Sequence, residues 1–374
     1  MKITNIRTEI VNVSQYSNWI FVIVDTDSNE TGYGEATLDG FEFEVAEMVK
    51  NISSGLIGKN VLSDNFSIQN KSGAMISAAA CSAIDMAMWD LKGKALGVPV
   101  YKLLGGAVRT EIPVYVSFNR AIADRSPEGF AKFAKELVAK GNTGLKCAPF
   151  DDYTWRNPLS KSEALERGIE RFAAIRDAVG FHIEIAVDAH WRFDFSTAMD
   201  VAARLKPLKP FWYEAPLPEH KPELIGKLRQ ECGIRIAGSE MQCHLEDHLP
   251  LLNNQCLDVY MPDVRYVGGI TGILKLAALL ETYDELISPH NMSGPIATAA
   301  SLHAAATMKN LINVEYHADE SERIPELSDK QFIVKNGCFE IPQSPGLGIN
   351  LCEDALKRYP YKKAVPLRKN MLGG

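Results

Sequence analysis

Residues 183–191 read IEIAVDAHW, an apolar run that ends in Asp188 and His190. Five later segments also end in an acidic residue or a histidine: Glu214 in FWYEAPLP, Glu240 in IAGSEMQ, Asp263 in VYMPDVRY, His290 in LISPHNMSG and Glu315 in LINVEYH. Starting from Asp188, consecutive members of this set are 26, 26, 23, 27 and 25 residues apart. One strand, one helix and two short loops need about this many residues, so the polar positions recur once per strand–helix unit.

Apolar and amphipathic segments alternate through the same part of the chain. The strand candidates are residues 112–118, 144–150, 182–189, 210–216, 234–240, 256–262, 286–290 and 311–316, and amphipathic segments such as 126–141 and 164–179 lie between them. This order predicts a (β/α) barrel over residues 111–334. A barrel brings the carboxyl ends of all its strands to one rim, where barrel enzymes carry their active sites. The alternative, a doubly wound open sheet, would scatter the six polar residues.

The first 110 residues have a different pattern. Residues 2–11 and 18–27 read as strands, and residues 74–96 carry apolar side chains at helical spacing up to a stop signal at Gly97. We therefore expect an α+β domain over residues 1–110. The tail reads as turns and short strands, and we expect part of residues 335–374 to return to this domain.

Composition excludes several classes of partner. A formal charge of −7 without a basic stripe disfavours binding to nucleic acid, and we see no apolar stretch of the 18 or so residues that a membrane helix needs. The beginning, MKITNIRTEIV, lacks the apolar core of a signal peptide. The seven cysteines are scattered and never in C-x-x-C spacing, which favours a reducing cytoplasm over a disulfide framework.

Asp188, Glu214 and Glu240 come from three consecutive strand ends. Three carboxylates at one rim would repel each other unless a cation lay among them. Oxygen ligands without cysteine or histidine favour Mg²⁺, or Mn²⁺ as a substitute, over zinc. Taken singly, each residue would more often be a helix cap or a solvated loop carboxylate. Because all three stand at the same place in consecutive strand–helix units, together they predict a metal site.

The remaining polar residues predict acid–base chemistry. Asp263 precedes His290 by one unit, and an adjacent carboxylate makes an imidazole a better general base. Lys146, in GLKCAPF, is a candidate base, a group that neutralises a substrate carboxylate, or a counter-ion of the metal ligands. Glu315 is either protonated by burial or ion-paired with Lys146 or an arginine. His190 is a candidate metal ligand, acid or rim residue.

These segments together resemble the enolase superfamily and, within it, the mandelate racemase subgroup. The resemblance covers nearly the whole chain and includes SAIDMAMWDLKGKALGVPVYKLLGG (82–106), VDAHW, WYEAPLP, GSEMQ, PDVRYVGG and SPHNMSGP. It implies an α+β capping domain and a (β/α)₇β barrel. It also implies one Mg²⁺ per subunit on Asp188, Glu214 and Glu240, and a catalytic dyad of His290 and Asp263. The muconate lactonizing branch has lysine where this chain has Asp263, which disfavours that branch.

Two positions distinguish reactions within the subgroup. Racemases of the subgroup carry Lys-x-Lys on the second barrel strand, whereas this chain has Lys146-Cys147-Ala148 and so lacks the second lysine. Asp188-Ala189-His190 is similar to the Asp-x-His of galactonate-type dehydratases of acid sugars. In those enzymes the histidine is the general acid that protonates the departing hydroxyl.

We therefore predict a Mg²⁺-dependent dehydratase (hydro-lyase) of a sugar acid, either an aldonate or an aldarate. His290 would remove the C2 proton and His190 would protonate the 3-hydroxyl, giving a 2-keto-3-deoxy acid, while Lys146 and Glu315 help to hold the substrate carboxylate. The alternative is a racemase or epimerase that uses Lys146 as the base on the opposite face. A metal hydrolase of the amidohydrolase kind should show His-x-His after the first barrel strand, where this chain has SFNR at 117–120.

The substrate itself is a small carboxylate whose distal carbons we expect to meet loops near residues 16–19 and 38–43. The candidate contacts are Tyr16, Trp19, Asn119, Arg120, Arg192 and His317. An arginine among them would suit a second carboxylate and hence an aldarate. We also expect a homo-oligomer, between a dimer and an octamer.

Overall fold

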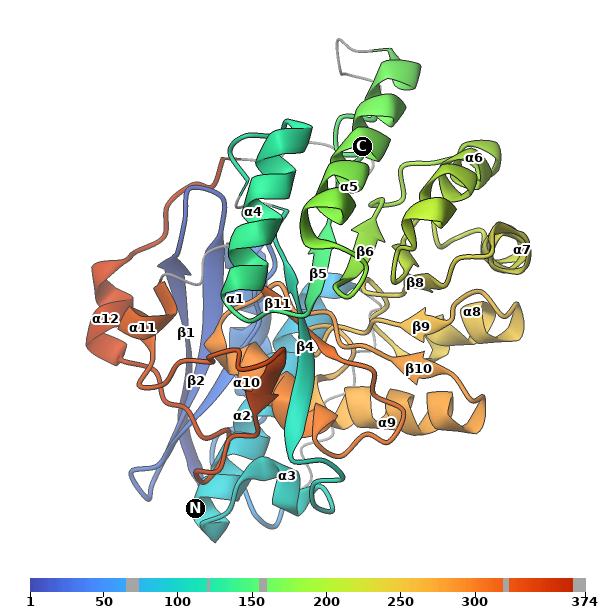
Figure 1. Ribbon diagram of the computed structural model, residues 1–374. Coiled ribbons are helices and arrows are strands. Elements are labelled where there is room, and N and C mark those ends of the chain that lie inside the picture. Colours follow the sequence, from blue (N-terminus) through green and yellow to red (C-terminus); the bar gives the residue numbers. More distant parts are fainter. Residues whose placement is uncertain (65–73, 120–121, 155–159, 319–322, 366–374) are drawn as a thin grey trace.

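The computed structural model describes residues 1–64, 74–119, 122–154, 160–318 and 323–365. A parallel barrel and a smaller sheet with its helices lie side by side (Figure 1). None of the helices in the described ranges combines the length and apolar composition that a membrane crossing requires.

Eight parallel strands form the barrel. They are β4 (Glu111–Ser117), β5 (Gly144–Cys147), β6 (Glu184–Asp188), β7 (Tyr213–Glu214), β8 (Ile236–Gly238), β9 (Val259–Tyr260), β10 (Leu286–Ile287) and β11 (Val314–His317). From β4 to β10 each strand pairs with the next one in the chain, and β11 pairs with β4. The ring closes between β10 and the segment before β11, where the Ile312 amide donates to the Ile287 carbonyl over 3.0 Å.

Each of the seven connections between consecutive barrel strands contains a helix. These helices are α4 (Pro127–Ala139), α5 (Lys161–Val179), α6 (Phe195–Leu205), α7 (Pro222–Cys232), α8 (Leu249–Asn253), α9 (Gly269–Thr282) and α10 (Pro295–Ala305). Among the described residues that follow β11 there is no long helix, and the first helical segment is the four-residue α11 (Ile324–Leu327). This arrangement confirms the (β/α)₇β barrel.

Several strands are shorter than the sequence predicts. The apolar segment 210–216, for example, contributes only the two paired residues of β7. Trp212, just before β7, is fully buried without being part of the strand. The apolar pattern of the sequence indicates which residues are buried, and in a barrel the buried residues extend beyond those that pair in the strands.

The smaller domain is built on an antiparallel sheet of β1 (Ile3–Asn12), β2 (Asn18–Thr26) and β3 (Thr31–Glu35). Its helices are α1 (Glu42–Ser53), α2 (Met75–Leu96) and the short α3 (Val100–Leu103). Helix α2 ends, as predicted, at Gly97, whose φ of 68° is left-handed. Strand β3 packs directly on α2. The two backbones are so close that a Cβ at Gly34 would lie 1.8 Å from the Ala83 carbonyl oxygen, so the position requires glycine.

The tail contacts both parts of the chain. Strand β12 (Cys338–Glu340) pairs antiparallel with β4, and α12 (Glu353–Arg358) lies beside β1. Arg7 in β1 donates to Glu353 over 2.8 Å, and the Asn12 amide donates to the Tyr359 carbonyl over 2.9 Å. The boundaries at residues 110 and 334 stay a prediction.

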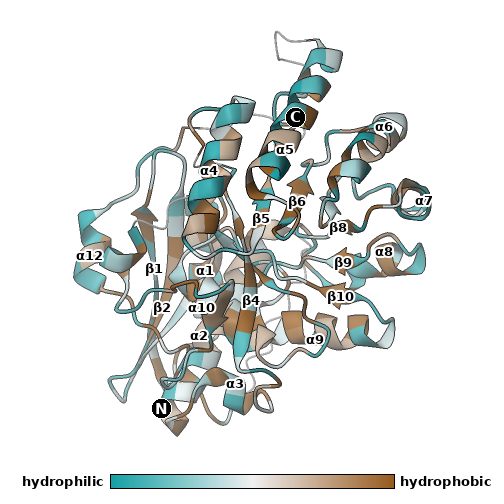
Figure 2. Cartoon of the chain, in the orientation of Figure 1, coloured by the Kyte–Doolittle hydropathy of each residue, from teal (hydrophilic) through white to brown (hydrophobic). Residues whose placement is uncertain are grey.

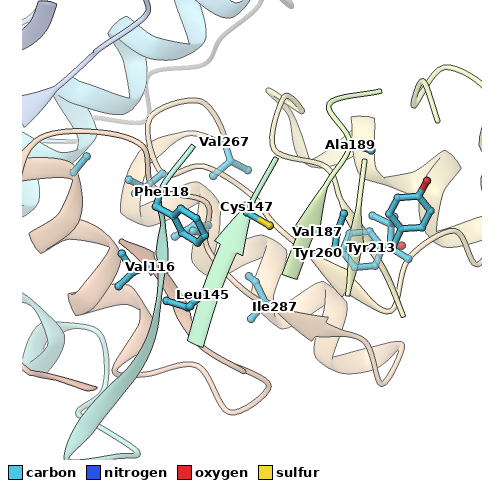
Figure 3. Packing of buried hydrophobic residues seen from close by; sticks show 14 of the residues in the cluster. Val116, Phe118, Leu145, Cys147, Val187, Ala189, Tyr213, Tyr260, Val267 and Ile287 are labelled. Carbon is cyan, nitrogen blue, oxygen red and sulfur yellow. The ribbon is translucent and has the colours of Figure 1, made fainter. Parts of the chain in front are cut away.

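Two apolar layers flank the barrel strands. Inside the ring lie Tyr115, Ala186, Trp212, Ala237, Val259 and Met261. Outside it, residues such as Val116, Leu145 and Cys147 pack under the helices (Figure 3). Figure 2 shows the same layering, with hydrophobic colouring on the strands and hydrophilic colouring on outer surfaces of helices such as α4 and α5.

Candidate active site

The alternation of side chains along a strand aims the carboxylates at the barrel axis. Asp188 lies two residues after Ala186, and Glu214 two residues after Trp212, and both apolar residues belong to the layer inside the ring. Residues two apart share a face of a strand, so both carboxylates point inward at the carboxyl end of the barrel. Asp188 and Glu214 are also paired in register between β6 and β7.

Left-handed backbone follows these strands. His190 and Trp191 have φ angles of 49° and 56°, Ala215 has 43° and Ser239 has 80°. Residues other than glycine adopt such angles at a cost and concentrate at functional sites. The turn after β6 is held by the Trp191 amide, which donates to the Ala215 carbonyl over 2.6 Å. The strain lies beside Asp188, Glu214 and Glu240.

Lys146 is surrounded by carboxylates. Its Nζ lies 2.7 Å from Oε1 of Glu214, 2.8 Å from Oε1 of Glu315 and 3.9 Å from Oδ2 of Asp188. Burial alone would lower the pKa of Lys146, but the charges of Glu214 and Glu315 raise it well above its usual value. Of the two alternatives for Glu315, the structure shows the ion pair with Lys146. Despite burial, this ion pair lowers the pKa of Glu315.

Negative charge is in excess around Glu214. Burial raises the pKa of Glu214 to about 8. The charges of Asp188, Glu240 and Glu315 act in the same direction, and the charge of Lys146 acts against them. One oxygen of Glu214 faces Lys146 and the other accepts a hydrogen bond from Trp212 over 2.9 Å. As they lie, the His, Cys, Asp and Glu side chains of the described ranges form no group of three that encloses a metal position.

His290 and Asp263 form a buried pair. Nδ1 of His290 lies 2.7 Å from Oδ2 of Asp263, while Nε2 lies 3.5 Å from Glu240 and 3.6 Å from Glu315. Burial lowers the pKa of His290, but Glu240, Glu315 and the bond to Asp263 raise it to about 9. Arg265 and His290 hold the pKa of Asp263 below its usual range although the carboxyl group is buried.

His190 belongs to a second pair. Its Nε2 lies 3.0 Å from Asp188 and its Nδ1 lies 3.3 Å from Oδ1 of Asp151. Burial opposes protonation, yet Asp188 and Asp151 raise the pKa of His190 to about 10. Asp151 also contacts Arg192 at 2.9 Å and Arg125 at 3.1 Å. Neither Asp151 nor Arg125 was predicted from the sequence.

One cavity of about 390 Å³ joins these groups. The predicted residues that line it are Lys146, Asp188, His190, Glu240, His290, Glu315, Tyr16 and Asn119. Glu214 and Asp263 lie behind this lining, in contact with Lys146 and His290 respectively. The lining also includes Leu38 and Asp39, in the loop that we expected to reach the substrate, and Arg125, Asp151, Met241, Arg265, Tyr266 and Met292.

Three of the predicted substrate contacts lie elsewhere. Trp19 is buried between the domains, edge-on to Phe21. Burial of its large apolar ring there removes more apolar surface from water than a place in the cavity would. His317 is 1% exposed, and its Nε2 lies 2.8 Å from the Ser293 carbonyl oxygen. Arg192 contacts Asp151 instead of lining the cavity. Arg120 falls outside the described residues.

The residues that the sequence analysis missed carry weak signals. Arg265 stands two places after Asp263 in PDVRYVGG, a spacing that allows both side chains to meet, but two-residue spacing is common. Asp151 follows the second strand segment, GLKCAPF, beyond the end that was analysed. Nothing in the sequence indicates that its partner is His190, 39 residues away.

Comparison with known proteins agrees with this architecture. The family model described as enolase C-terminal domain-like matches residues 129–355, and that of the mandelate racemase / muconate lactonizing enzyme N-terminal domain matches residues 4–105. The chain is 34% identical over 348 residues to a D-gluconate dehydratase of Thermoproteus tenax, covering 91% of this chain and 69% of that protein.

Two further relatives are similar over almost their whole length. A D-galactonate dehydratase of Xanthomonas oryzae pv. oryzae is 30% identical over 370 residues, which is 96% of this chain and 94% of that protein. The crystal structure of a member of the enolase superfamily from Salmonella Typhimurium has a TM-score of 0.87 and 29% identity, with 96% of this chain and 98% of that chain covered. The resemblance in the sequence is thereby confirmed: the chain belongs to the enolase superfamily, in the family of mandelate racemase and muconate lactonizing enzyme.

Proposed function

We propose that the protein is a Mg²⁺-dependent dehydratase of sugar acids that converts an aldonate to a 2-keto-3-deoxy acid. The observation that carries the proposal is the pair of histidines at one cavity, His290 with Asp263 and His190 with Asp151. An elimination needs one group to take a proton and another to give one. The similarity to proteins named D-gluconate dehydratase and D-galactonate dehydratase supports the same reaction class here.

Asp188, Glu214 and Glu240 are the residues that would hold the ion. Their donor set consists of oxygen atoms alone, as Mg²⁺ prefers. The raised pKa of Glu214 supports the same assignment, because the neighbouring carboxylates that contribute to it leave negative charge for a dication to balance. When bound, the ion supplies positive charge that stabilises the charge developing on the substrate carboxylate.

The proton transfers are assigned to the two histidines. With Nδ1 donating to Asp263, Nε2 of His290 is left as the atom that accepts the C2 proton, provided that positive charge held by Glu240 offsets the carboxylate charges that raise the pKa of His290. The electron pair of the broken C–H bond then forms the C2–C3 double bond as the C3–O bond breaks. Protonated His190 gives its proton to the departing hydroxyl, which leaves as water. The enol takes up a proton at C3 and becomes the 2-keto-3-deoxy acid.

Lys146 supports dehydration over racemisation. Its ammonium group is held between Glu214 and Glu315 at 2.7 and 2.8 Å, an arrangement that favours a permanent counter-ion over a base. Ala148, where racemases of the subgroup have their second lysine, is fully buried and offers no base. The opposite face of the substrate would therefore meet the acid His190.

The cavity favours an aldonate over an aldarate. Among the described residues, each lysine and arginine of its lining is already paired: Lys146 with Glu214, Arg125 with Asp151 and Arg265 with Asp263. A substrate whose distal carbons carry hydroxyl groups suits this surface.

The test is a panel of aldonates and the corresponding aldarates incubated with Mg²⁺, with semicarbazide to detect keto acids. We expect keto acid from one or a few aldonates and none from aldarates. Parallel reactions in D₂O separate the alternatives. Recovery of both C2 epimers carrying deuterium, without any keto acid, would establish the racemase instead.

A further inference from the structure

One backbone carbonyl of the smaller domain accepts two hydrogen bonds from the barrel. The Thr37 oxygen, two residues after β3, accepts from Nη1 of Arg265 over 2.9 Å and from the hydroxyl of Tyr266 over 3.0 Å. All three residues are buried. Buried hydrogen bonds to a charged donor are worth more than neutral ones, so the Arg265 bond is a strong anchor for this segment.

Arg265 also holds the carboxylate that orients the proposed base. Its backbone amide and Nε donate to Oδ1 of Asp263 over 2.8 and 2.9 Å, and Nη2 donates to Oδ2 over 2.5 Å. The planar fork of the guanidinium fixes the plane of the Asp263 carboxylate. Oδ2, which accepts the hydrogen bond from Nη2, is also the oxygen that faces Nδ1 of His290.

A second contact ties the same segment to the loop that carries His290. Glu35, the last residue of β3, accepts from the amides of Gly294 and Ala297 over 2.6 and 3.0 Å at the beginning of α10. Thr37 donates to Glu35 over 3.0 Å. The approach is close, since a Cβ at Gly294 would lie 2.8 Å from the ring of Trp19.

The next residues of this segment line the cavity. Leu38 and Asp39 follow Thr37 directly, and both face the space where the substrate would bind. Residues 35–39 therefore line the cavity and also contact both Arg265, which binds Asp263, and the loop that carries His290. A displacement of this segment would remove one of the four bonds that orient the Arg265 guanidinium and backbone.

We propose that Arg265 is a positioning residue that couples residues 35–39 of the smaller domain to the Asp263–His290 pair. The base then has its working orientation only while residues 35–39 lie on the barrel rim. The catalytic consequence rests on the proposed function, whereas the structural coupling does not. The competing explanation is that Arg265 only neutralises the buried charge of Asp263, in which case its bond to Thr37 has no influence on the base.

Three variants separate these explanations. Arg265→Lys keeps the positive charge but loses the fork, Tyr266→Phe removes only the second bond to Thr37, and Arg176→Lys is the matched control. Arg176 is equally buried, but it bonds to carbonyl groups of Gly180, Ile183, Leu208 and Lys209, away from the cavity. Both lysine variants lose a buried fork, so shared effects report on destabilisation alone.

The first measurement is amide hydrogen exchange of residues 36–40 without substrate. We expect exchange there to be at least about tenfold faster in Arg265→Lys than in the wild type, where a tenfold change corresponds to about 1.4 kcal/mol. The acceleration should be smaller in Tyr266→Phe, and Arg176→Lys should exchange at the wild-type rate. Wild-type protection of residues 36–40 in Arg265→Lys would overturn the coupling. This outcome is independent of whether any sugar acid is a substrate.

The second measurement is the rate of C2 proton exchange in D₂O together with kcat and KM for the aldonate found in the screen. We expect C2 exchange and kcat to fall together by about 10- to 100-fold in Arg265→Lys, because misplacing a base by a fraction of an ångström costs about this much. In Tyr266→Phe, KM should rise while kcat stays within about threefold, because the fork remains. Unchanged C2 exchange in Arg265→Lys would refute its positioning role. If wild-type protein acts on no sugar acid, the proposed function fails and the exchange of residues 36–40 still decides the coupling.

Discussion

Nδ1 of His190 lies 3.3 Å from Oδ1 of Asp151, and the same carboxylate is held by Arg192 and Arg125 at 2.9 and 3.1 Å. The two guanidinium groups fix Asp151 in place, so the imidazole has a rigid partner on the side away from Asp188. Together with His290 and Asp263, this gives the cavity two histidines that are each oriented by a buried carboxylate.

Replacing Asp151 by asparagine should slow water loss more than proton removal. The amide keeps the size of the side chain but loses the charge that favours protonated His190, and we expect kcat for keto-acid formation to fall by about 10- to 100-fold. Exchange of the C2 proton in D₂O, which depends on His290, should persist. Asp152→Asn is the control, because its carboxylate pairs with Arg171 instead. Equal effects of the two substitutions would show that Asp151 is not specific to His190.

The barrel was predictable from the sequence because one physical constraint recurs in it. Each strand must be apolar because it is buried on both sides, and a polar residue such as Asp188 or Glu214 stands at the carboxyl end of several strands. The number of barrel strands, the seven helices between them and the absence of a long helix among the described residues after β11 follow from this rhythm.

The residues that the sequence did not indicate depend on contacts across long separations. Arg265 meets Thr37, 228 residues away, and Asp151 meets His190, 39 residues away, so neither partner is visible in a local pattern. Trp19 was assigned to the substrate from its place near an expected loop, and His317 from its place near the barrel rim. Both side chains fill the interior, and a place in the chain does not reveal which face of an element a residue occupies.

Replacing His290 by asparagine should abolish both C2 exchange and keto-acid formation. Asparagine can still face Asp263 but cannot accept a proton, so a loss on the order of 10²–10⁴-fold or more is expected in kcat. His182→Asn removes an exposed histidine two residues before β6 and should leave both rates unchanged. Near-wild-type turnover by a folded His290→Asn protein would mean that another group is the base.

Mg²⁺ should stabilise the folded protein even without substrate. A ligand that binds only the folded state raises the free energy of unfolding by about 2.7 kcal/mol at 100 times its Kd. We expect chelator-treated protein to show a higher Tm when Mg²⁺ is added, and Glu240→Gln to lose most of this shift. Glu246→Gln, on an exposed position of the same connection, is the control. An equal shift in Glu240→Gln would remove Glu240 from the ligand set.

Stability should fall in mild acid because of His303, which is buried in α10 and accepts a hydrogen bond from the Tyr101 amide over 3.2 Å. Burial lowers the pKa of His303 from 6.5 to about 4. The folded state therefore favours the neutral ring, and its contribution is complete above pH 6.5 and lost as the pH falls to about 4. The difference in pKa corresponds to roughly 3 kcal/mol. Denaturant unfolding at pH 7 and at pH 5 should show a smaller loss of stability for His303→Gln than for the wild-type chain. Equal losses for the two proteins would show that protonation of His303 does not contribute.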